Sequence, residues 1–146
     1  MTNLHGDTLC AYVAGIIDGE GSIDIYRVNA HREKPRYALR VCVGITNPWL
    51  PQFLKDVFGG SVYLTEHENP NHKDCWFWAV QAQKAVKVLL RITPYLQLKR
   101  PQAELALSFQ SRKRKCSHLT DEQRVLEEAD RILMKSYNKK GKGVLQ

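Results

Sequence analysis

The sequence predicts an α+β fold, built in the order αββαββα with a four-stranded antiparallel sheet and further helices at the C-terminal end. Three observations predict it. An uncharged run with helical spacing opens the chain, two pairs of alternating segments follow, and helical spacing returns between and after the pairs. Strands that carry apolar residues on one side pack that side against helices. We therefore expect helices on one face of the sheet and an uncovered polar face on the other.

The first helix is expected to begin near Thr8, with Asp7 as its N-cap. No charged residue follows before Asp18, so the helix is apolar on all sides and is expected to be buried. It is too short for a bilayer, which takes about 20 apolar residues. Ala11 and Gly15 lie four positions apart on one side, where a second helix backbone can approach closely. The apolar residues at helical spacing are Leu9, Val13, Ile16 and Ile17.

Gly19 and Gly21 are expected to end this helix, because glycine accepts backbone conformations that other residues resist. Glu20 is then presented at the C-terminal end of the helix. A carboxylate is disfavoured there, since that end carries partial negative charge, and a divalent metal ion would compensate for it. The alternative is a plain Asp-Gly turn that leads into a strand.

Alternating apolar and polar residues predict two β-hairpins, with turns at residues 29–35 and 68–73. In the first hairpin, the inward side chains are Ile23, Ile25, Leu39, Val41, Val43 and Ile45, and the outward ones are Ser22, Asp24, Tyr26, Val28, Ala38, Arg40, Cys42, Gly44 and Thr46. In the second, Val62, Leu64, Trp76, Trp78 and Val80 point inward and Tyr63, Thr65, His67, Phe77 and Ala79 point outward. We assign the two tryptophans to the core in preference to base stacking.

Four further helical segments complete the pattern. The first follows Asn47 and Pro48, which indicate a cap and a helix start, and stops at two glycines. Its apolar residues are Leu50, Phe53, Leu54, Val57 and Phe58; the next segment has Ala85, Val86, Leu89, Leu90 and Ile92 and stops before Pro94. Another opens at Pro101 with Ala103, Leu105, Ala106, Leu107 and Phe109, and the last, capped within residues 117–123, has Val125, Leu126, Ala129, Ile132 and Leu133.

The charge of the chain favours a polyanionic partner. Its net charge is +7 and its pI about 9.3. The basic residues form three groups, which are Arg27, Arg32, Lys34 and Arg36, then Arg112, Lys113, Arg114 and Lys115, then Lys135, Lys139, Lys140 and Lys142. The four cysteines, Cys10, Cys42, Cys75 and Cys116, lack disulfide or zinc spacing and are read as free thiols. We expect one domain over residues 1–146, with a core at about 7–110 and a helix and basic tail at 111–146, in a soluble intracellular protein with no membrane partner.

The segment VAGIIDGEG at residues 13–21 resembles the signature of the LAGLIDADG homing endonucleases. A second segment, PYLQLKRPQA at residues 94–103, is similar to the family's run of proline, aliphatic residue, lysine and Gln-Ala. The resemblance covers about residues 7–109 and implies the same αββαββα order. It further implies a site-specific, intron-encoded nuclease that cuts double-stranded DNA, in a bacterial cytoplasm or an organelle.

The resemblance also implies a site. Glu20 would bind Mg²⁺ or another divalent cation such as Mn²⁺, Gly19 would add its carbonyl, Asn47 would position water, and Lys99 would stabilise developing charge. The chain departs from the family at three positions: Glu20 stands where many members have Asp, Asn47 where a longer Gln is common, and Pro51 where one branch has a basic residue.

The motif occurs once, so two active sites require a homodimer. Its interface is predicted at Ala11, Tyr12, Ala14, Gly15 and Asp18. Two subunits would read a pseudo-palindrome of about 16 to 20 base pairs, because a strand advances about 3.3 Å per residue, close to a base step. The predicted DNA contacts are Asp24, Tyr26, Val28, Arg32, Lys34, Arg36, Ala38, Arg40, Cys42, Tyr63, Thr65, His67 and Phe77.

Within that set, Arg40 is expected to contact guanine, because it stands alone as a long forked donor on the outward face; a phosphate contact is the alternative. Two other functions stay open at this point, an intron RNA maturase and a DNA-binding protein that does not cut.

Overall fold

The computed structural model describes residues 4–29, 31–113 and 118–139. It has the predicted α+β order with a four-stranded antiparallel sheet. The elements are α1 (Gly6–Glu20), β1 (Gly21–Arg27), β2 (Tyr37–Ile45), α2 (Trp49–Phe58), β3 (Ser61–Thr65), β4 (Cys75–Gln81), α3 (Ala82–Ile92), the short 3-10 helix η1 (Thr93–Tyr95), α4 (Arg100–Ser111) and α5 (Asp121–Lys139). Of the basic and cysteine positions singled out above, Arg114, Lys115, Cys116, Lys140 and Lys142 lie outside the described residues.

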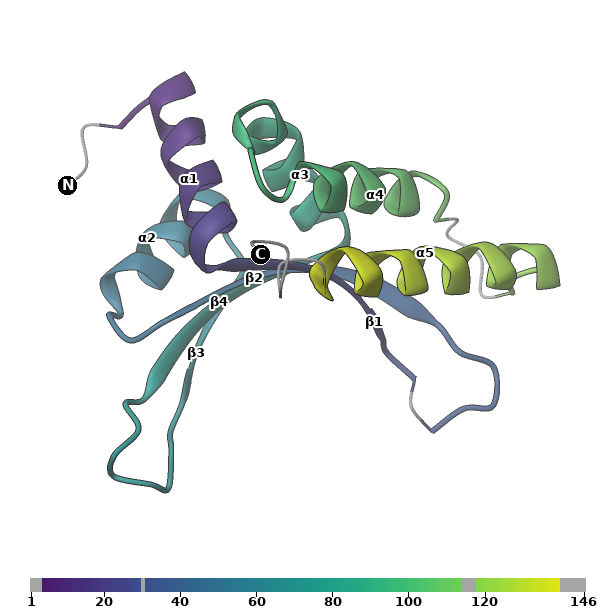
Figure 1. The fold of residues 1–146 in the computed structure, drawn as a ribbon, viewed down its shortest axis with the longest axis horizontal. Helices are drawn as coiled ribbons and strands as arrows, with labels where there is room; N and C mark the ends of the chain where they lie inside the picture. The colour runs from purple at the N-terminus through teal and green to yellow at the C-terminus, as the bar shows by residue number, and fades with distance from the viewer. Residues whose placement is uncertain (1–3, 30, 114–117, 140–146) are drawn as a thin grey trace, which may run out of the picture.

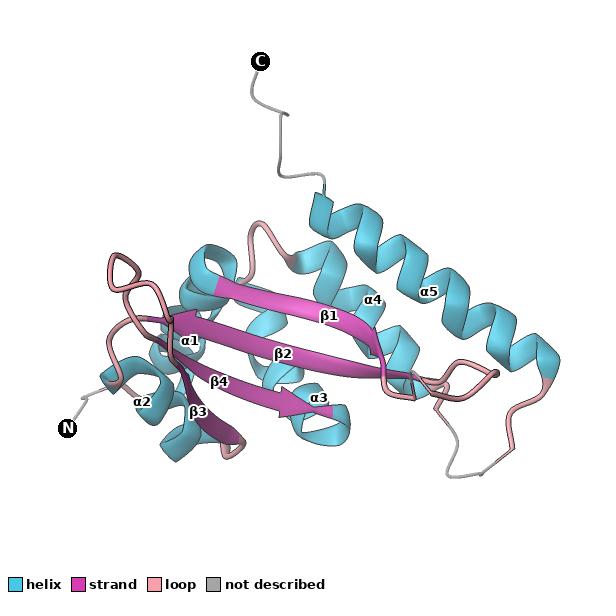
Figure 2. Cartoon of the chain, turned by 90° about the horizontal axis from the view of Figure 1, so that it is seen from below, coloured by secondary structure: helices cyan, strands magenta, loops and turns pink. Residues whose placement is uncertain are grey.

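The strands lie in the order β1-β2-β4-β3, and each neighbouring pair is antiparallel. The sheet arches, with the helices on its convex side and the loops of the two hairpins extending away from them (Figure 1). Seen from below, the strands lie in front, and within the described residues no helix covers their concave face (Figure 2). This arrangement confirms the prediction of one covered and one uncovered face.

The core lies between the sheet and the helices, and alternation along the strands determines which residues enter it. Ile23, Leu39, Val41, Val43 and Trp78 have no exposed surface. Burial of side chains of this size stabilises the fold by about 1.5–3 kcal/mol each. One assignment needs correction, because Leu64, which was placed on the inward side, is 37% exposed near the end of β3. On α3, Val88 is buried, whereas Leu90 is 62% exposed.

The two ends of α1 differ from the prediction. The helix begins at Gly6, with His5 as N-cap and no side-chain capping bond, so Asp7 is not the cap. Asp7 lies in the first turn and hydrogen-bonds the hydroxyl of Tyr95, which raises the pKa of that tyrosine. At the other end, neither Gly19 nor Gly21 has a positive φ. Gly21 is required for space, since a Cβ there would lie 2.8 Å from Cα of Ile17.

Side-chain hydrogen bonds support the starts of two later helices. α2 begins at Trp49 with Pro48 as its N-cap, so Asn47 is not the cap, but its side-chain oxygen accepts from the backbone N–H of Trp49 at 2.9 Å. Thr120 and Gln123 form a reciprocal capping box, in which the N–H of Thr120 donates to the Gln123 side chain at 3.0 Å and the N–H of Gln123 donates to the Thr120 hydroxyl at 3.2 Å. These bonds satisfy N–H groups that the first turns of α2 and α5 leave without intrahelical partners.

Candidate active site and nucleic-acid interface

Glu20 is the last residue of α1 and its side chain is exposed. The next residue, Gly21, begins β1 and pairs with Val43 near the end of β2. The carboxylate therefore lies where the first helix enters the sheet. The tight packing of Gly21 on Ile17 fixes the angle between helix and strand at this point.

The end of α1 and the start of α4 are joined by exchanged hydrogen bonds. The carboxylate of Asp18 accepts from the backbone N–H groups of Gln97, Leu98 and Lys99 at 2.8, 3.1 and 3.0 Å. In return, Nζ of Lys99 donates to the carbonyl oxygens of Ile17 and Asp18, both at 2.9 Å. A carboxylate thus binds the segment that leads into the N-terminal end of α4, and an ammonium caps the negative C-terminal end of α1.

This exchange changes the interpretation of two predicted residues. Asp18 was expected at a dimer interface, but its carboxylate is engaged within its own chain. Lys99 supplies a cation at the end of α1, so a metal ion is not required there to offset the helix dipole. Burial lowers the pKa of Lys99, while the nearby charges of Asp18 and Glu20 act in the opposite direction.

The metal donors available in one chain are few. Glu20 offers an exposed carboxylate, and the preceding Gly19 is exposed as well. Within the described residues, no group of three or more His, Cys, Asp or Glu side chains is placed to hold a metal ion. Mg²⁺ keeps several waters and binds through one or two carboxylates, so a pair of Glu20 residues from two chains would fit its needs.

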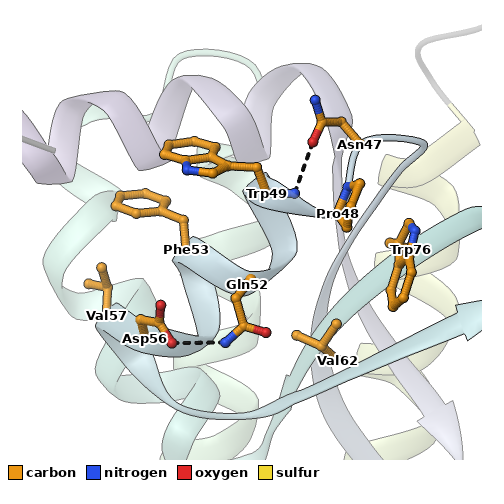
Figure 3. A pocket seen from close by; sticks show the side chains of 9 residues that line it. All are labelled: Asn47, Pro48, Trp49, Gln52, Phe53, Asp56, Val57, Val62 and Trp76. Atoms are coloured by element: carbon orange, nitrogen blue, oxygen red, sulfur yellow. Dashed lines mark hydrogen bonds between the residues drawn. The ribbon is translucent and has the colours of Figure 1, made fainter. Parts of the chain in front are cut away.

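Asn47 lies at the rim of an open groove of about 780 Å³ between α2 and the second hairpin (Figure 3). Its oxygen faces the backbone N–H of Trp49, while the exposed Trp49 ring stacks on Phe53 at 5.2 Å. The groove also includes the inward residues Val62 and Trp76, so it opens on the helical side of the sheet. Neither Glu20 nor Lys99 lines it, and Pro51 is buried in α2.

The predicted DNA contacts lie on the uncovered face of the sheet and in the two hairpin loops, and they differ in exposure. Asp24, Tyr26, Arg36, Ala38, Arg40, Cys42 and Phe77 are half-buried, and Val28, Arg32, Lys34, Tyr63, Thr65 and His67 are exposed. The Phe77 ring covers Gly44 of the neighbouring strand and stacks on Tyr63 at 5.4 Å. Tyr63 and Phe77 therefore form a stacked pair of aromatic rings on this face.

Two neighbours on β1 orient the side chain of Arg40. Its guanidinium lies 3.6 Å from the carboxylate of Asp24, its partner across the strands, and 4.7 Å from the centre of the Tyr26 ring. Nε of Arg40 is buried without a hydrogen-bond partner. The contact of Arg40 with guanine stays a prediction.

Sequence analysis missed the residue that orders the first hairpin loop. Asn29 donates to the carbonyl of Lys34 at 2.8 Å and accepts from the N–H of Arg36 at 2.7 Å. Arg27 donates to the carbonyl of Arg32 at 2.7 Å. These three hydrogen bonds connect the two sides of the basic loop. The signal was present, since asparagine in a polar turn commonly bonds nearby backbone.

Comparison with solved structures gives consistent neighbours. The homing endonuclease I-CvuI, in complex with its target, matches 91% of this chain and 83% of its own at 22% identity, with a TM-score of 0.72. An archaeal intron-encoded homing endonuclease, I-Vdi141I complexed with DNA, matches 96% and 90% at 16% identity, with a TM-score of 0.76. The LAGLIDADG homing endonuclease I-GzeII, also with a DNA target, matches 86% and 43% at 20% identity, with a TM-score of 0.63. This chain has the LAGLIDADG homing endonuclease fold.

Neither a protein-family model nor a curated protein matches the sequence. In the LAGLIDADG fold adopted here, the motif helix is α1, and its outer side carries Ala11, Tyr12 and Gly15, which are all exposed. Ala14 has no exposed surface in a single chain, and its place at the interface stays a prediction. Added side chains at Gly15 and Gly19 would meet nothing within 4 Å in a single chain. No described helix is both long and apolar enough to cross a membrane.

Proposed function

We propose that this chain is a site-specific homing endonuclease that cuts double-stranded DNA by metal-dependent phosphodiester hydrolysis. The observation that carries the proposal is the set of hydrogen bonds between the end of α1 and the segment that leads into α4, which we call the joint. The proposal is also supported by the fold, whose solved neighbours include complexes with DNA. At the joint, Glu20 is exposed one turn from carbonyls that hold Nζ of Lys99 at 2.9 Å. The fold thus holds a free carboxylate and a partly buried ammonium close together.

The proposed chemistry assigns a task to each group. Glu20, with the carbonyl of Gly19, would bind Mg²⁺ or Mn²⁺, which when bound makes water nucleophilic near neutral pH. The Lys99 ammonium, which burial separates from bulk water, would stabilise negative charge that develops on the phosphate. Asp18 holds Lys99 through its backbone and so fixes the ammonium relative to Glu20. Asn47 is proposed to orient water, although its oxygen already accepts from the backbone N–H of Trp49.

The proposal includes a homodimer. One chain offers one Glu20, and cutting two strands requires two sites. The outer side of α1 is small and uncharged at Ala11 and Gly15, so two such helices can pack closely about a two-fold axis and bring the Glu20 residues together. The chain also matches most of the I-CvuI and I-Vdi141I chains but 43% of I-GzeII, which is long enough for two such units.

Sequence recognition is proposed for the concave sheet face and the two loops beside it. Arg40 is held over Tyr26 and against Asp24, a geometry that limits its conformations and suits a bidentate guanine contact. Arg40→Ala should then relax preference at one or two symmetric positions and cost about 1–3 kcal/mol. If all sites weaken alike and the salt dependence falls, Arg40 contacts phosphate and is not a specificity residue.

Selection of cleaved sequences from a randomised DNA library tests the proposed function. With Mg²⁺, we expect recovery of a pseudo-palindromic site of about 16 to 20 base pairs, and with EDTA no enrichment. If sequences bind specifically but no cut products appear with Mg²⁺ or Mn²⁺, the chain is a DNA-binding protein that does not cut. Intron RNA as a partner, and the cellular location, stay predictions from the sequence.

A further inference from the structure

α5 is attached to the rest of the chain by its polar side. Asp130 pairs with Arg112, and Glu127 lies 3.0 Å from Nζ of Lys113. Glu128 accepts from the hydroxyl of Tyr37 at the base of the first hairpin. Two further bonds go to backbone carbonyls, from Asn138 to Ile23 at 3.1 Å and from Arg124 to Pro35 at 3.3 Å.

The opposite side of α5 is apolar and faces outward. Val125 is 67% exposed and Ile132 is 55% exposed, the highest values on this side. We call this surface the outer face of α5; its members are Val125, Leu126, Ala129, Ile132 and Leu133, all exposed. Their spacing of three and four residues places them on one stripe of the helix. These contacts hold the helix in this rotation, because turning the outer face inward would break the two ion pairs and the three hydrogen bonds at once.

The outer face of α5 is separate from the predicted dimer surface on α1. α5 packs on α4, β1 and β2, and it runs beside β1 at one end of the molecule, while α1 stands toward the other end (Figures 1 and 2). A partner on α5 therefore leaves the outer side of α1 free.

The charges around the outer face of α5 are arranged for self-recognition. Asp121 and Glu122 lie at the N-terminal end, and Lys135 and Lys139 at the C-terminal end, and all four are exposed. Ala129 is at the middle of the stripe and has the smallest side chain in it. In two antiparallel copies crossing at Ala129, Asp121 lies eight residues before the crossing point. Asp121 therefore lies between Lys135 and Lys139 of the second copy, because these two residues are six and ten positions after the crossing point.

We propose that the outer face of α5 binds the same face of a second copy, with the two helices antiparallel about a two-fold axis at Ala129. Apolar residues then meet at the centre, and opposite charges meet at both ends. Five side chains bury less than the roughly 800 Å² per partner of a stable interface, so this contact is weak and concentration-dependent. Because it lies apart from α1, it links α1-paired dimers to one another, and it does not depend on whether the chain cuts DNA.

Disulfide trapping tests the arrangement directly. A residue on a two-fold axis faces its own copy, so Ala129→Cys is expected to form a dimer under mild oxidation of the full chain. Ser136→Cys, exposed on the same side but seven residues from the axis, is the matched control and is expected to stay monomeric on a denaturing gel, as is the wild type. Equal cross-linking at the two positions, or none at position 129 above wild type, overturns the proposal.

Sedimentation velocity provides the second arm, in a Gly15→Leu background where the α1 pair is blocked. The weight-average mass is expected to rise above 16.8 kDa with concentration and to return to it after Ile132→Glu. Leu90→Glu, at an equally exposed position on α3, is the control and should change nothing. Asp121→Lys is expected to weaken association at least several-fold, and Lys135→Asp with Lys139→Asp to restore it. The proposal is contradicted if Ile132→Glu leaves the weight-average mass unchanged, or if the charge reversal does not restore association.

Discussion

α1 packs its apolar side against the rest of the protein, whereas α5 packs its acidic side inward and leaves most of its apolar residues exposed. α1 buries Leu9, Val13 and Ile17 against the sheet and shows small residues outside. α5 buries Asp130 beside Met134, is held by ion pairs, and exposes its larger apolar residues. Both helices have regular apolar spacing in the sequence. The comparison teaches that such spacing identifies a helix, whereas the groups it packs against decide which side faces inward.

The neighbours of α5 explain the difference. The helix lies beside Arg112 and Lys113, which follow the end of α4, and beside the first hairpin, which offers the hydroxyl of Tyr37 and the carbonyl of Pro35. Polar groups half removed from water need partners, and the acidic side of α5 supplies them. α1 instead meets strand residues without polar side chains, such as Val41 and Val43.

The largest effect on stability is expected at the inner side of α5. Met134 is 1% exposed there, so Met134→Ala should lower the free energy of unfolding by about 2–5 kcal/mol through lost burial and a cavity. Ile132→Ala, on the outer face of the same helix, should change it by no more than about 0.5 kcal/mol. Urea unfolding of both variants measures this. Equal losses would mean that α5 has been placed in the wrong rotation.

A smaller effect is expected where α1 enters the sheet. Gly21→Ala would press a methyl group against the Cα and carbonyl oxygen of Ile17, at 2.8 and 2.9 Å, and should cost about 1–3 kcal/mol. Gly19→Ala meets open space within a helix and should instead stabilise the chain by up to about 1 kcal/mol. Thermal unfolding at low protein concentration compares the two variants. If both are tolerated alike, the close approach of Gly21 to α1 is not real.

The smallest effect is a pH dependence of the attachment of α5. Hydrogen bonds from Arg131 and Tyr37 lower the pKa of Glu128 below its usual value near 4.5. The folded state therefore gains stability from Glu128 above that value and loses it as the pH falls through the lowered pKa. The group is partly exposed, so the loss should be under about 1 kcal/mol. Urea titrations at pH 6 and pH 3 should show a smaller difference for Glu128→Gln than for wild type; an unchanged difference would exclude this role.

Much of the fold could be predicted from the sequence because alternation and helical spacing are local properties. The strands around Ile23 and Leu39, the stop at Gly59 and Gly60, and the capped start of α5 all follow from neighbouring residues. What failed depended on contacts between distant segments. The exposure of Leu64 reflects how far the second hairpin extends beyond the helices, and no local pattern contains that distance.

The site divides in the same way. Glu20 and Lys99 were predicted from short motifs, and Lys99 lies against the end of the helix that carries Glu20. The contact of Asp18 with the segment before α4 could not be predicted, because its three N–H donors lie about 80 residues further along the chain. The pairing of Arg40 with Asp24 was accessible in principle, since it needs only the register of the first hairpin.

Glu20→Gln provides the most direct test of the central claim. On a site recovered by library selection, we expect the variant to lose Mg²⁺-dependent cleavage while it binds the same DNA within a few-fold of wild type. Glu104→Gln, an exposed acid on α4 away from the joint, should cut normally. Single-turnover cleavage and gel-shift binding, measured on one DNA, separate the two properties. Cleavage by Glu20→Gln at a rate near that of wild type would contradict the account.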